Sequence, residues 1–378
     1  MKELNEKEWK IFPARIAELG EVAEIPALDE KEWREFSLDD IFTVSAGKRL
    51  ETRNKVPGTR PFIGATDNNN GVTGFVGNDN SSRDGNVLGV NYNGAPCIAF
   101  YHPYECIFTD DVKRLHLRHY SDNKFVLLFF VSVFAKQRSK YSYGYKFKEQ
   151  RMLRQKLMLP VTDSGEPDYE YMAEYVQQKR AAMLTKYRTY VEARIAELGE
   201  VAEIPALDEK EWKPIFISSM FELVRGREDN MAMLEDGDTP LISAKANNNG
   251  LKGFVHNPKK IIAGQCITLN NDGDGGAGLA YYQPANMALD SHVTALIPLI
   301  DMSAFVMLFI AKCISGLHGF FGHGLSISNP RAKRLRIMLP VTDSGEPDYE
   351  YMEQYAKNMM LRKYQQYLTF LQQRRNAR

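Results

Sequence analysis

The chain has 378 residues, of which 44% are hydrophobic, and its 48 basic side chains are balanced by 48 acidic ones. This length predicts two or three domains with cores of their own, and the neutral charge excludes an overall electrostatic attraction to nucleic acid, so any basic surface must be local. Four cysteines without CxxC spacing and a charged N-terminus argue against disulfides, zinc and a signal peptide, so we expect a soluble cytoplasmic protein with no membrane contact.

Two blocks of sequence occur twice without change. One block of twenty residues stands at Ala14–Trp33 and Ala193–Trp212, and one of fourteen stands at Leu159–Met172 and Leu339–Met352. The segments between the blocks correspond to each other but have diverged. This pattern predicts a tandem repeat. We divide the chain into an N-terminal connector (1–33), a first globular domain (34–160), a central connector with a long helix (161–212), a second globular domain (213–340) and a C-terminal long helix (341–378).

Each globular domain opens with an apolar segment that ends in glycine and cations. Lys48 and Arg49 follow Gly47 in the first domain, and Arg225 and Arg227 flank a glycine in the second. These side chains either hold phosphates or belong to a solvated loop.

An asparagine triplet followed by glycine comes next, at Asn68, Asn69 and Asn70 and again at Asn247–Asn249. Asparagine amides can pair with adenine edges, but Asn-Asn-Gly is also typical of a hairpin turn. Both interpretations stay open for the candidate residues, which in the second domain are Asn247, Asn248 and the preceding Lys245. The short β-rich runs around such turns predict strands, and the apolar runs Phe125–Ala135 and Phe305–Ile310 predict buried helices.

Each domain closes with a stretch that mixes aromatic and polar residues. Ser139–Lys148 interleaves aromatics and cations, as nucleic-acid surfaces often do, and His318–Asn329 is its counterpart. Core packing of the aromatics is the competing interpretation. The candidates for DNA contact in these stretches are Tyr143, Tyr145, Lys146 and Lys148 in the first domain and His323, Ser326, Asn329 and Arg331 in the second.

Helical periodicity follows each copy of the fourteen-residue block. A helix from Asp168 to Leu198 would be about 45 Å long, with Asp168 or Asp348 as a candidate N-cap. Each helix has one apolar stripe, so we predict an antiparallel pair. Its seam would contain Tyr187, Tyr190 and Val191 with Tyr367, Leu368 and Leu371. The expected fold is therefore α/β, with two mostly-β domains joined by two long antiparallel helices as a pseudo-twofold tandem repeat.

No catalytic, metal or cofactor site is expected. His116 and His119 have x-x spacing, but no carboxylate or thiol cluster accompanies them. The glycine-rich run Asn271–Gly278 lacks the Gly-Lys-Ser/Thr of a phosphate-binding loop and predicts a tight turn.

The order of these features resembles the specificity (S) subunit of type I restriction-modification enzymes over nearly the whole chain. The features are the Phe-x-Leu-x-x-Ile-Phe-like openings at Phe36–Phe42 and Ile215–Phe221, the Asn-Asn-Gly-x-x-Gly-Phe-Val segments, and a Leu-Pro-Val strand that leads into a long helix. Each motif alone is common, and their doubled order is more specific.

The resemblance implies a non-catalytic, cofactor-free reader of double-stranded DNA. The globular domains would be target-recognition domains that each read half of a split site. The helices would space these domains and dock two methyltransferase (M) subunits, through which restriction (R) subunits join. The helix length is comparable to one B-DNA turn of about 34 Å.

Two other interpretations remain open. One is the equivalent subunit of a type IIB system with a bipartite site. The other is a tandem-repeat scaffold that binds only proteins, which the neutral charge permits. An enzyme is disfavoured, because a fused methylase would need a cofactor domain for which this length leaves no room.

Overall fold

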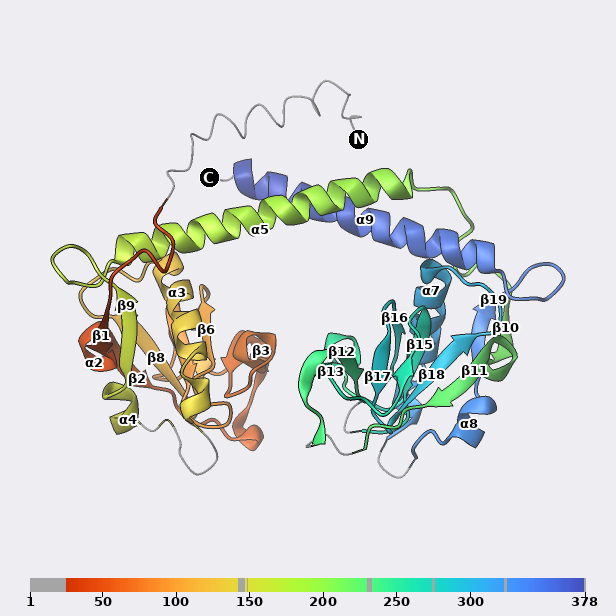
Figure 1. The fold of residues 1–378 in the computed structure, drawn as a ribbon, viewed down its shortest axis with the longest axis horizontal. Helices are drawn as coiled ribbons and strands as arrows, with labels where there is room; N and C mark the ends of the chain where they lie inside the picture. Colours follow the sequence, from red (N-terminus) through yellow and green to blue (C-terminus); the bar gives the residue numbers. More distant parts are fainter. Residues whose placement is uncertain are drawn as a thin grey trace, which may run out of the picture. The chain divides into compact units, whose positions relative to one another are not determined.

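A computed structural model describes residues 25–141, 147, 149–229, 233–273, 276–322 and 325–376. The chain forms two compact units, residues 1–187 (unit 1) and 188–378 (unit 2), which divide inside the long helix α5 (Tyr169–Leu198) (Figure 1). Both units combine small β-sheets with a few helices, and each contains part or all of a long helix. The predicted α/β tandem repeat with mostly-β domains is therefore confirmed.

The strands of unit 1 form three small sheets with the orders β1-β9, β2-β8-β5-β6 and β4-β3-β7. They are β1 (Trp33–Ser37), β2 (Phe42–Ala46), β3 (Pro57–Ile63), β4 (Val72–Val76), β5 (Val87–Asn91), β6 (Ala99–His102), β7 (Ile107–Phe108), β8 (Val112–Leu117) and β9 (Lys156–Pro160). The helices before α5 are α2 (Leu38–Ile41), α3 (Lys124–Ala135) and α4 (Glu149–Leu153), with short 3-10 turns η1 (Thr52–Asn54), η2 (Asn69–Gly71) and η3 (Arg138–Lys140).

Unit 2 repeats this plan, with the sheet orders β10-β19, β11-β18-β15-β16 and β13-β12-β17-β14. Its strands are β10 (Trp212–Phe216), β11 (Phe221–Arg225), β12 (Asp236–Ile242), β13 (Leu251–Val255), β14 (Ile261–Ile262), β15 (Cys266–Asn270), β16 (Ala280–Gln283), β17 (Met287–Leu289), β18 (Val293–Pro298) and β19 (Arg336–Pro340). Its helices are α6 (Ile217–Met220), α7 (Ala304–Ser315), α8 (Asn329–Lys333) and α9 (Tyr349–Asn376), with 3-10 turns η5 (Asn248–Gly250) and η6 (His318–Phe320).

The two apolar runs form the central helices α3 and α7, as predicted. Asn123 caps the start of α3 by accepting a hydrogen bond from the backbone N–H of Phe125 at 2.8 Å. The buried residues of α3 recur at helical spacing, and they include Phe130, whose ring meets that of Phe42 edge to face at 4.7 Å. These helices lie against the four-stranded sheet of their unit and form the centre of its core (Figure 1).

The repeated blocks fold back on each other to form what we call the connector clasp of each unit. In unit 1, Lys31 Nζ lies 2.8 Å from Asp168 Oδ2, and Tyr171 Oη donates to the carbonyl oxygen of Pro26 at 2.9 Å. Asp168 also accepts from the backbone N–H of Tyr171 at 3.0 Å, which confirms it as the N-cap of α5. Unit 2 makes the same three contacts at 2.8, 3.0 and 3.0 Å through Lys210, Asp348, Tyr351 and Pro205.

The end of α5 packs against α9 within unit 2. The rings of Tyr190 and Tyr364 meet edge to face at 6.4 Å. Further along the chain, Asn358 Nδ2 donates to the carbonyl oxygen of Ala202 at 2.8 Å, and the backbone N–H of Ala202 donates to Asn358 Oδ1 at 3.0 Å. As the chain advances from Tyr190 to Ala202, the residue of α9 that it contacts moves back from Tyr364 to Asn358. The two segments therefore run antiparallel in this unit, as predicted.

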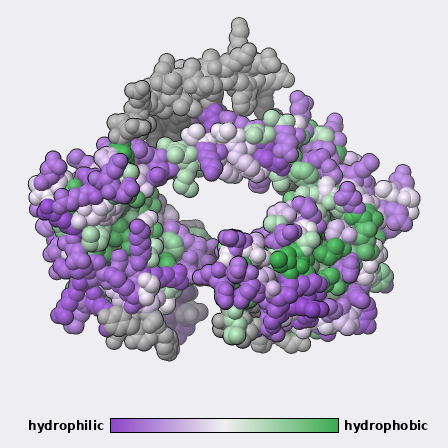
Figure 2. Space-filling view, viewed as in Figure 1, coloured by the Kyte–Doolittle hydropathy of each residue, from purple (hydrophilic) through white to green (hydrophobic). Residues whose placement is uncertain are grey.

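The predicted seam is correct in part. Val191 is fully buried, whereas Tyr190 is 51% exposed and Tyr187 is 44% exposed, so these two rings are not the buried members of a seam. Tyr367, Leu368 and Leu371 are half-buried. Figure 2 shows hydrophilic and moderately hydrophobic side chains mixed along the long helices, and none of the described helices has the length and apolar character to cross a bilayer.

Candidate nucleic-acid interface

The asparagine triplets form the same tight turn in both units. The φ angles are 50° and 53° at Asn69 and Asn70, and 51° and 54° at Asn248 and Asn249. Asparagine tolerates this left-handed region better than most residues, because its short side chain can form local hydrogen bonds. The turn interpretation of the triplets is therefore confirmed.

The last asparagine of each triplet is also fixed through its side chain. Asn70 Nδ2 donates to Tyr104 Oη at 3.1 Å, and Asn249 Nδ2 donates to Gln283 Oε1 at 3.2 Å and to the carbonyl oxygen of Tyr282 at 3.0 Å. These two amides serve the fold. All six asparagines of the two triplets are exposed, and the predicted ones, Asn68, Asn69, Asn70, Asn247 and Asn248, stay candidates for DNA contact.

An exposed cation stands at the same place in each unit, directly after a glycine. A Cβ on Gly47 would lie 1.9 Å from a backbone oxygen, and a Cβ on Gly226 would lie 2.1 Å from one. Only glycine permits so close an approach, and the exposed residues Lys48 and Arg227 follow. The other two predicted cations, Arg49 and Arg225, are also exposed.

The closing stretches contain core residues as well as surface residues. Tyr141 and Phe147 are buried, with ring centroids 4.6 Å apart, so core packing is the correct interpretation for these two aromatics. Four candidates of the first domain, Tyr143, Tyr145, Lys146 and Lys148, lie outside the described residues, and so does His323 of the second.

The remaining candidates of the second closing stretch surround the start of α8. Ser326 is exposed, and its carbonyl oxygen accepts from the guanidinium of Arg331, which is half-buried. Asn329 Oδ1 accepts from Thr294 Oγ1 at 3.2 Å, so Asn329 is tied to β18. Of the three, Ser326 is the most accessible to a ligand.

An open hollow of about 440 Å³ lies in unit 2, lined by residues on both sides of the second asparagine turn. Asp272 Oδ1 lies 2.7 Å from Nδ1 of His292, and Asp290 Oδ1 accepts from the backbone N–H of His292 at 3.0 Å. Asp272 therefore holds the imidazole ring of His292, and Asp290 holds its backbone. The complete lining is Ser243, Ala244, Lys245, Lys252, Asp272, Gly273, Asp290 and His292.

Of these lining residues, only Lys245 is a candidate that the sequence predicts. Lys245 is half-buried, and its Nζ donates to the carbonyl oxygen of Leu251 at 3.1 Å. Lys252, Asp272 and His292 carry no motif of their own. A position-by-position comparison of the two repeats is the signal that could have found them, because all three differ in chemistry from their counterparts in unit 1.

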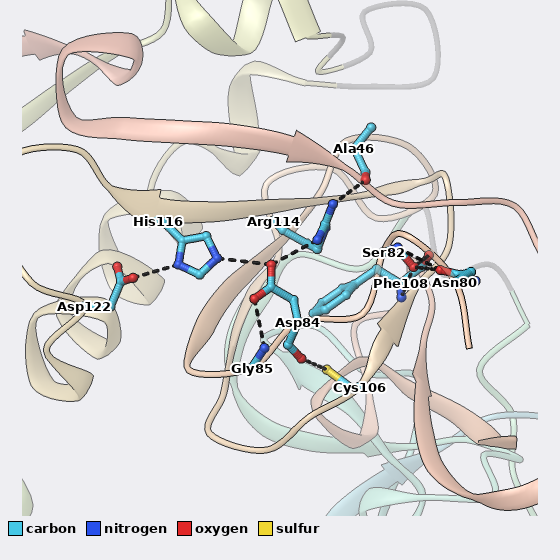
Figure 3. A network of polar contacts seen from close by, with 10 residues as sticks. All are labelled: Ala46, Asn80, Ser82, Asp84, Gly85, Cys106, Phe108, Arg114, His116 and Asp122. Atoms are coloured by element: carbon cyan, nitrogen blue, oxygen red, sulfur yellow. Dashed lines mark hydrogen bonds and ion pairs between the residues drawn. The ribbon is translucent and has the colours of Figure 1, made fainter. Parts of the chain in front are cut away.

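A polar network in unit 1 joins side chains from three separate segments (Figure 3). Asp84 Oδ2 accepts from Arg114 Nη1 at 3.0 Å and lies 3.1 Å from His116 Nε2. The other ring nitrogen of His116 lies 2.6 Å from Asp122 Oδ2. Burial opposes a charge on the ring, but the hydrogen bonds to Asp122 and Asp84 outweigh it and raise the pKa of His116 above its ordinary value.

Apolar side chains fill the corresponding place in unit 2. Strand pairing puts Ile262, Ala295 and Ile297 where unit 1 has Asp84, Arg114 and His116. The side chains of the network are largely buried and bonded to one another, so the network packs the interior of unit 1. Among the described residues, no group of three or more potential metal ligands is placed to hold an ion.

The stability of unit 1 should depend on pH through His116. A histidine whose pKa is raised by folding stabilises the fold fully below its unfolded pKa of about 6.5, and this contribution is lost as the pH rises through the folded value. We expect the free energy of unfolding to fall above about pH 6.5 in the wild type and to fall less in His116→Gln. Urea unfolding between pH 5.5 and 8.5 measures this. The exposed His119→Gln is the control, and an equal slope in His116→Gln and the wild type would contradict the expectation.

Two segments of the chain, residues 30–200 and 209–367, match the family model described as the type I restriction modification DNA specificity domain. Together they cover most of the 378 residues, so the chain belongs to this family. The resemblance that the doubled motifs predict is thereby confirmed.

The chain is 50% identical over 157 residues to S.BcgI, the specificity subunit of a type II restriction enzyme from Heyndrickxia coagulans. The match covers 42% of this chain and 46% of that protein, so it spans about half of the relative's length.

Solved structures of S subunits are more distant. The type I S subunit from M. genitalium is 14% identical, with a TM-score of 0.45 over 93% of this chain and 96% of that one. The HsdS subunit from Thermoanaerobacter tengcongensis is 13% identical, with a TM-score of 0.30 over 90% and 91%. The family assignment rests on the family model.

Proposed function

We propose that this chain is the DNA sequence-recognition subunit of a restriction-modification complex. Residues 34–160 and 213–340 are its two target-recognition domains, and each reads one half of a bipartite double-stranded target. The segments 161–212 and 341–378 carry the helices that space these domains and dock two methyltransferase subunits, through which restriction subunits join. Pro26 and Lys31 of the connector 1–33 complete the first clasp. The chain itself catalyses no reaction, holds no cofactor and acts in the cytoplasm.

One observation carries this proposal: the side chains of the loops differ between the two units, whereas the contacts of the connector clasps are the same. The clasp contacts of the two units differ by no more than 0.1 Å. By contrast, exposed side chains next to the asparagine turns differ in kind, as Thr73 and Lys252 illustrate. Clasps with the same contacts are expected if both units bind equivalent protein partners. Loops with different side chains are expected if the units read two different DNA half-sites.

A second candidate is the corresponding subunit of a type II system with a bipartite site. The 50% identity over 157 residues to S.BcgI favours it. Both candidates share the recognition mechanism, and the genes that flank the coding sequence distinguish them.

The proposal predicts sequence-selective DNA binding that weakens with salt. The chain should be purified with its methyltransferase partner and offered a DNA library, and the affinity for the selected site measured at several salt concentrations. Each phosphate contacted by a cation should contribute about −0.9 to the slope of log affinity against log salt. Lys48→Ala and Arg227→Ala should weaken binding and reduce the slope by about one each.

Lys186→Ala, which removes an exposed cation of α5, is the matched control and should leave the affinity for DNA unchanged. An affinity that is flat in salt, or binding without any preference among DNA sequences, would contradict the proposal, and a complete lack of DNA binding would favour the protein-only scaffold.

A further inference from the structure

The two units share one backbone framework around the hollow. The side-chain Nδ2 of Asn91 donates to the carbonyl oxygen of Thr66 at 2.9 Å, and that of Asn270 donates to the carbonyl oxygen of Lys245 at 3.1 Å. Both asparagines are buried. Two further backbone bonds correspond: Tyr92 N to Asp111 O at 3.1 Å and Asn271 N to His292 O at 2.9 Å. Thr66 and Asp111 of unit 1 therefore occupy the positions of Lys245 and His292 of unit 2.

A glycine in a left-handed conformation completes this framework in each unit. Gly94 has a φ of 71° and Gly273 has a φ of 103°. A Cβ on either would come within 3.0 Å or less of the carbonyl oxygen of an alanine, Ala65 or Ala244. The residue before each glycine, Asn93 or Asp272, is thus held at the same point of both units.

A polar pair bridges this framework in both units, but its chemistry differs. In unit 1, Asn93 Nδ2 donates to Asp111 Oδ1 at 2.9 Å. In unit 2, Asp272 Oδ1 lies 2.7 Å from His292 Nδ1. The backbone framework is the same in both units, but the paired side chains that it holds are of different types. This is expected of positions that determine specificity.

The pair in unit 1 offers hydrogen-bond acceptors. With one amide N–H of Asn93 bound to Asp111, the pair retains two acceptors, the Asn93 side-chain oxygen and the second carboxylate oxygen of Asp111, beside the second amide N–H. Lys113, two residues further along, is 7% exposed and lies over the ring of Tyr92, so its ammonium is engaged there.

The hollow in unit 2 also carries two lysine ammonium groups, which are hydrogen-bond donors. Its two carboxylates already hold His292, through the ring and through the backbone. Lys252 is exposed, and Lys245 donates one of its three N–H bonds to Leu251. The corresponding positions in unit 1 are Thr66 and Thr73, which carry no charge.

Resting on the proposed function, we propose that this framework is a base-reading subsite in both units and that its side chains set the base each unit accepts. Unit 2 takes the acceptor edge of guanine, O6 and N7, through Lys245 and Lys252. Unit 1 takes an exocyclic amino group, from cytosine N4 or adenine N6, through Asp111 and Asn93. This follows the major-groove pattern in which lysine pairs with guanine and carboxylates accept from amino groups.

The comparison of the units argues for base edges over phosphates. A phosphate site must carry donors or positive charge, and unit 1 places the carboxylate of Asp111 at the same point of the framework. A carboxylate repels phosphate but accepts readily from an amino group. The position that holds Asp111 in unit 1 and His292 in unit 2 is therefore suited to distinguishing bases.

The test converts the subsite of unit 2 to that of unit 1 and selects DNA sequences again. The assembled complex with its methyltransferase partner is used, with Lys245→Thr, Lys252→Thr, Asp272→Asn and His292→Asp combined in one chain. We expect the preference for guanine at one position of one half-site to fall by about tenfold or more, as one good base contact provides. The other half-site, read by unit 1, should be unchanged and serves as the internal control.

Two single variants test the inference even if the fourfold variant does not fold. Lys252→Thr alters one exposed residue and should weaken the guanine preference alone. Asp111→Asn should weaken the preference for an amino-bearing base in the opposite half-site only.

Three outcomes have distinct meanings. A loss of affinity that is equal for all sequences would overturn the inference, because these residues would then contact phosphate. An unchanged base preference in Lys252→Thr and Asp111→Asn would overturn it as well. A wild-type complex that selects no sequence at all would overturn the proposed function itself.

Discussion

Replacing Val191 with aspartate should destabilise unit 2 by about 3 kcal/mol or more. Val191 of α5 and Leu361 of α9 are both fully buried, in the part of the helices where the rings of Tyr190 and Tyr364 meet. The substitution removes about 1.5 kcal/mol of apolar burial and adds a carboxylate without a partner, which costs more than the lost burial. Urea unfolding of the full chain, combined with hydrogen exchange of unit 2 amides, measures the loss.

Thr189→Asp is the matched control, because Thr189 is exposed on the same helix two residues away. It should unfold close to the wild type. If Val191→Asp and Thr189→Asp unfolded at the same urea concentration, burial of Val191 would not stabilise unit 2.

Removing the carboxylate of Asp84 should have an effect of similar size in unit 1. The side chains of Arg114 and Asp84 are only 11% and 18% exposed, so Asp84→Ala leaves a guanidinium with little solvent and no carboxylate partner. Breaking a fully buried pair costs about 3–5 kcal/mol, and we expect about 2–4 kcal/mol for this partly buried one. The measurement is urea unfolding near pH 6. Glu105→Ala, which removes the exposed partner of Arg83, should change little.

Unit 2 suggests how to recover this stability. The triple variant Asp84→Ile, Arg114→Ala and His116→Ile gives unit 1 the side chains that unit 2 has at these positions. Replacing a buried ionic network by well-packed apolar groups is often neutral or stabilising, so the triple variant should regain most of what Asp84→Ala loses. A triple variant less stable than Asp84→Ala would show that the two units do not pack interchangeably here.

The architecture could be predicted from sequence because it depends on local patterns repeated twice. The apolar run Phe125–Ala135 has the length and spacing of a buried helix, and Asp168 stands where a helix cap is needed. Asn-Asn-Gly favours a turn through the conformational preference of these residue types alone. Each of these signals lies within about a dozen residues and is independent of the rest of the chain.

The site depends on contacts between distant residues, which such patterns do not contain. Asp84 and Arg114 are 30 residues apart, and the register of the strands brings them together. Asp272 and His292 meet because β15 and β18 pair antiparallel, with Asn270 opposite Val293. Burial was equally hard to infer: Tyr141 and Phe147 belong to an aromatic and basic stretch typical of a surface, yet both are in the core.

The connector clasps have a genetic consequence. Both partners of every clasp contact, Lys31 with Asp168 and Pro26 with Tyr171, lie inside the two blocks that the chain carries in duplicate. A pair of crossovers, one in the coding sequence of each flanking block, would therefore exchange the whole intervening domain and leave each clasp with a matching partner. We therefore expect such a gene to accept a different domain at these blocks without any compensating mutation at the points where the domain is joined.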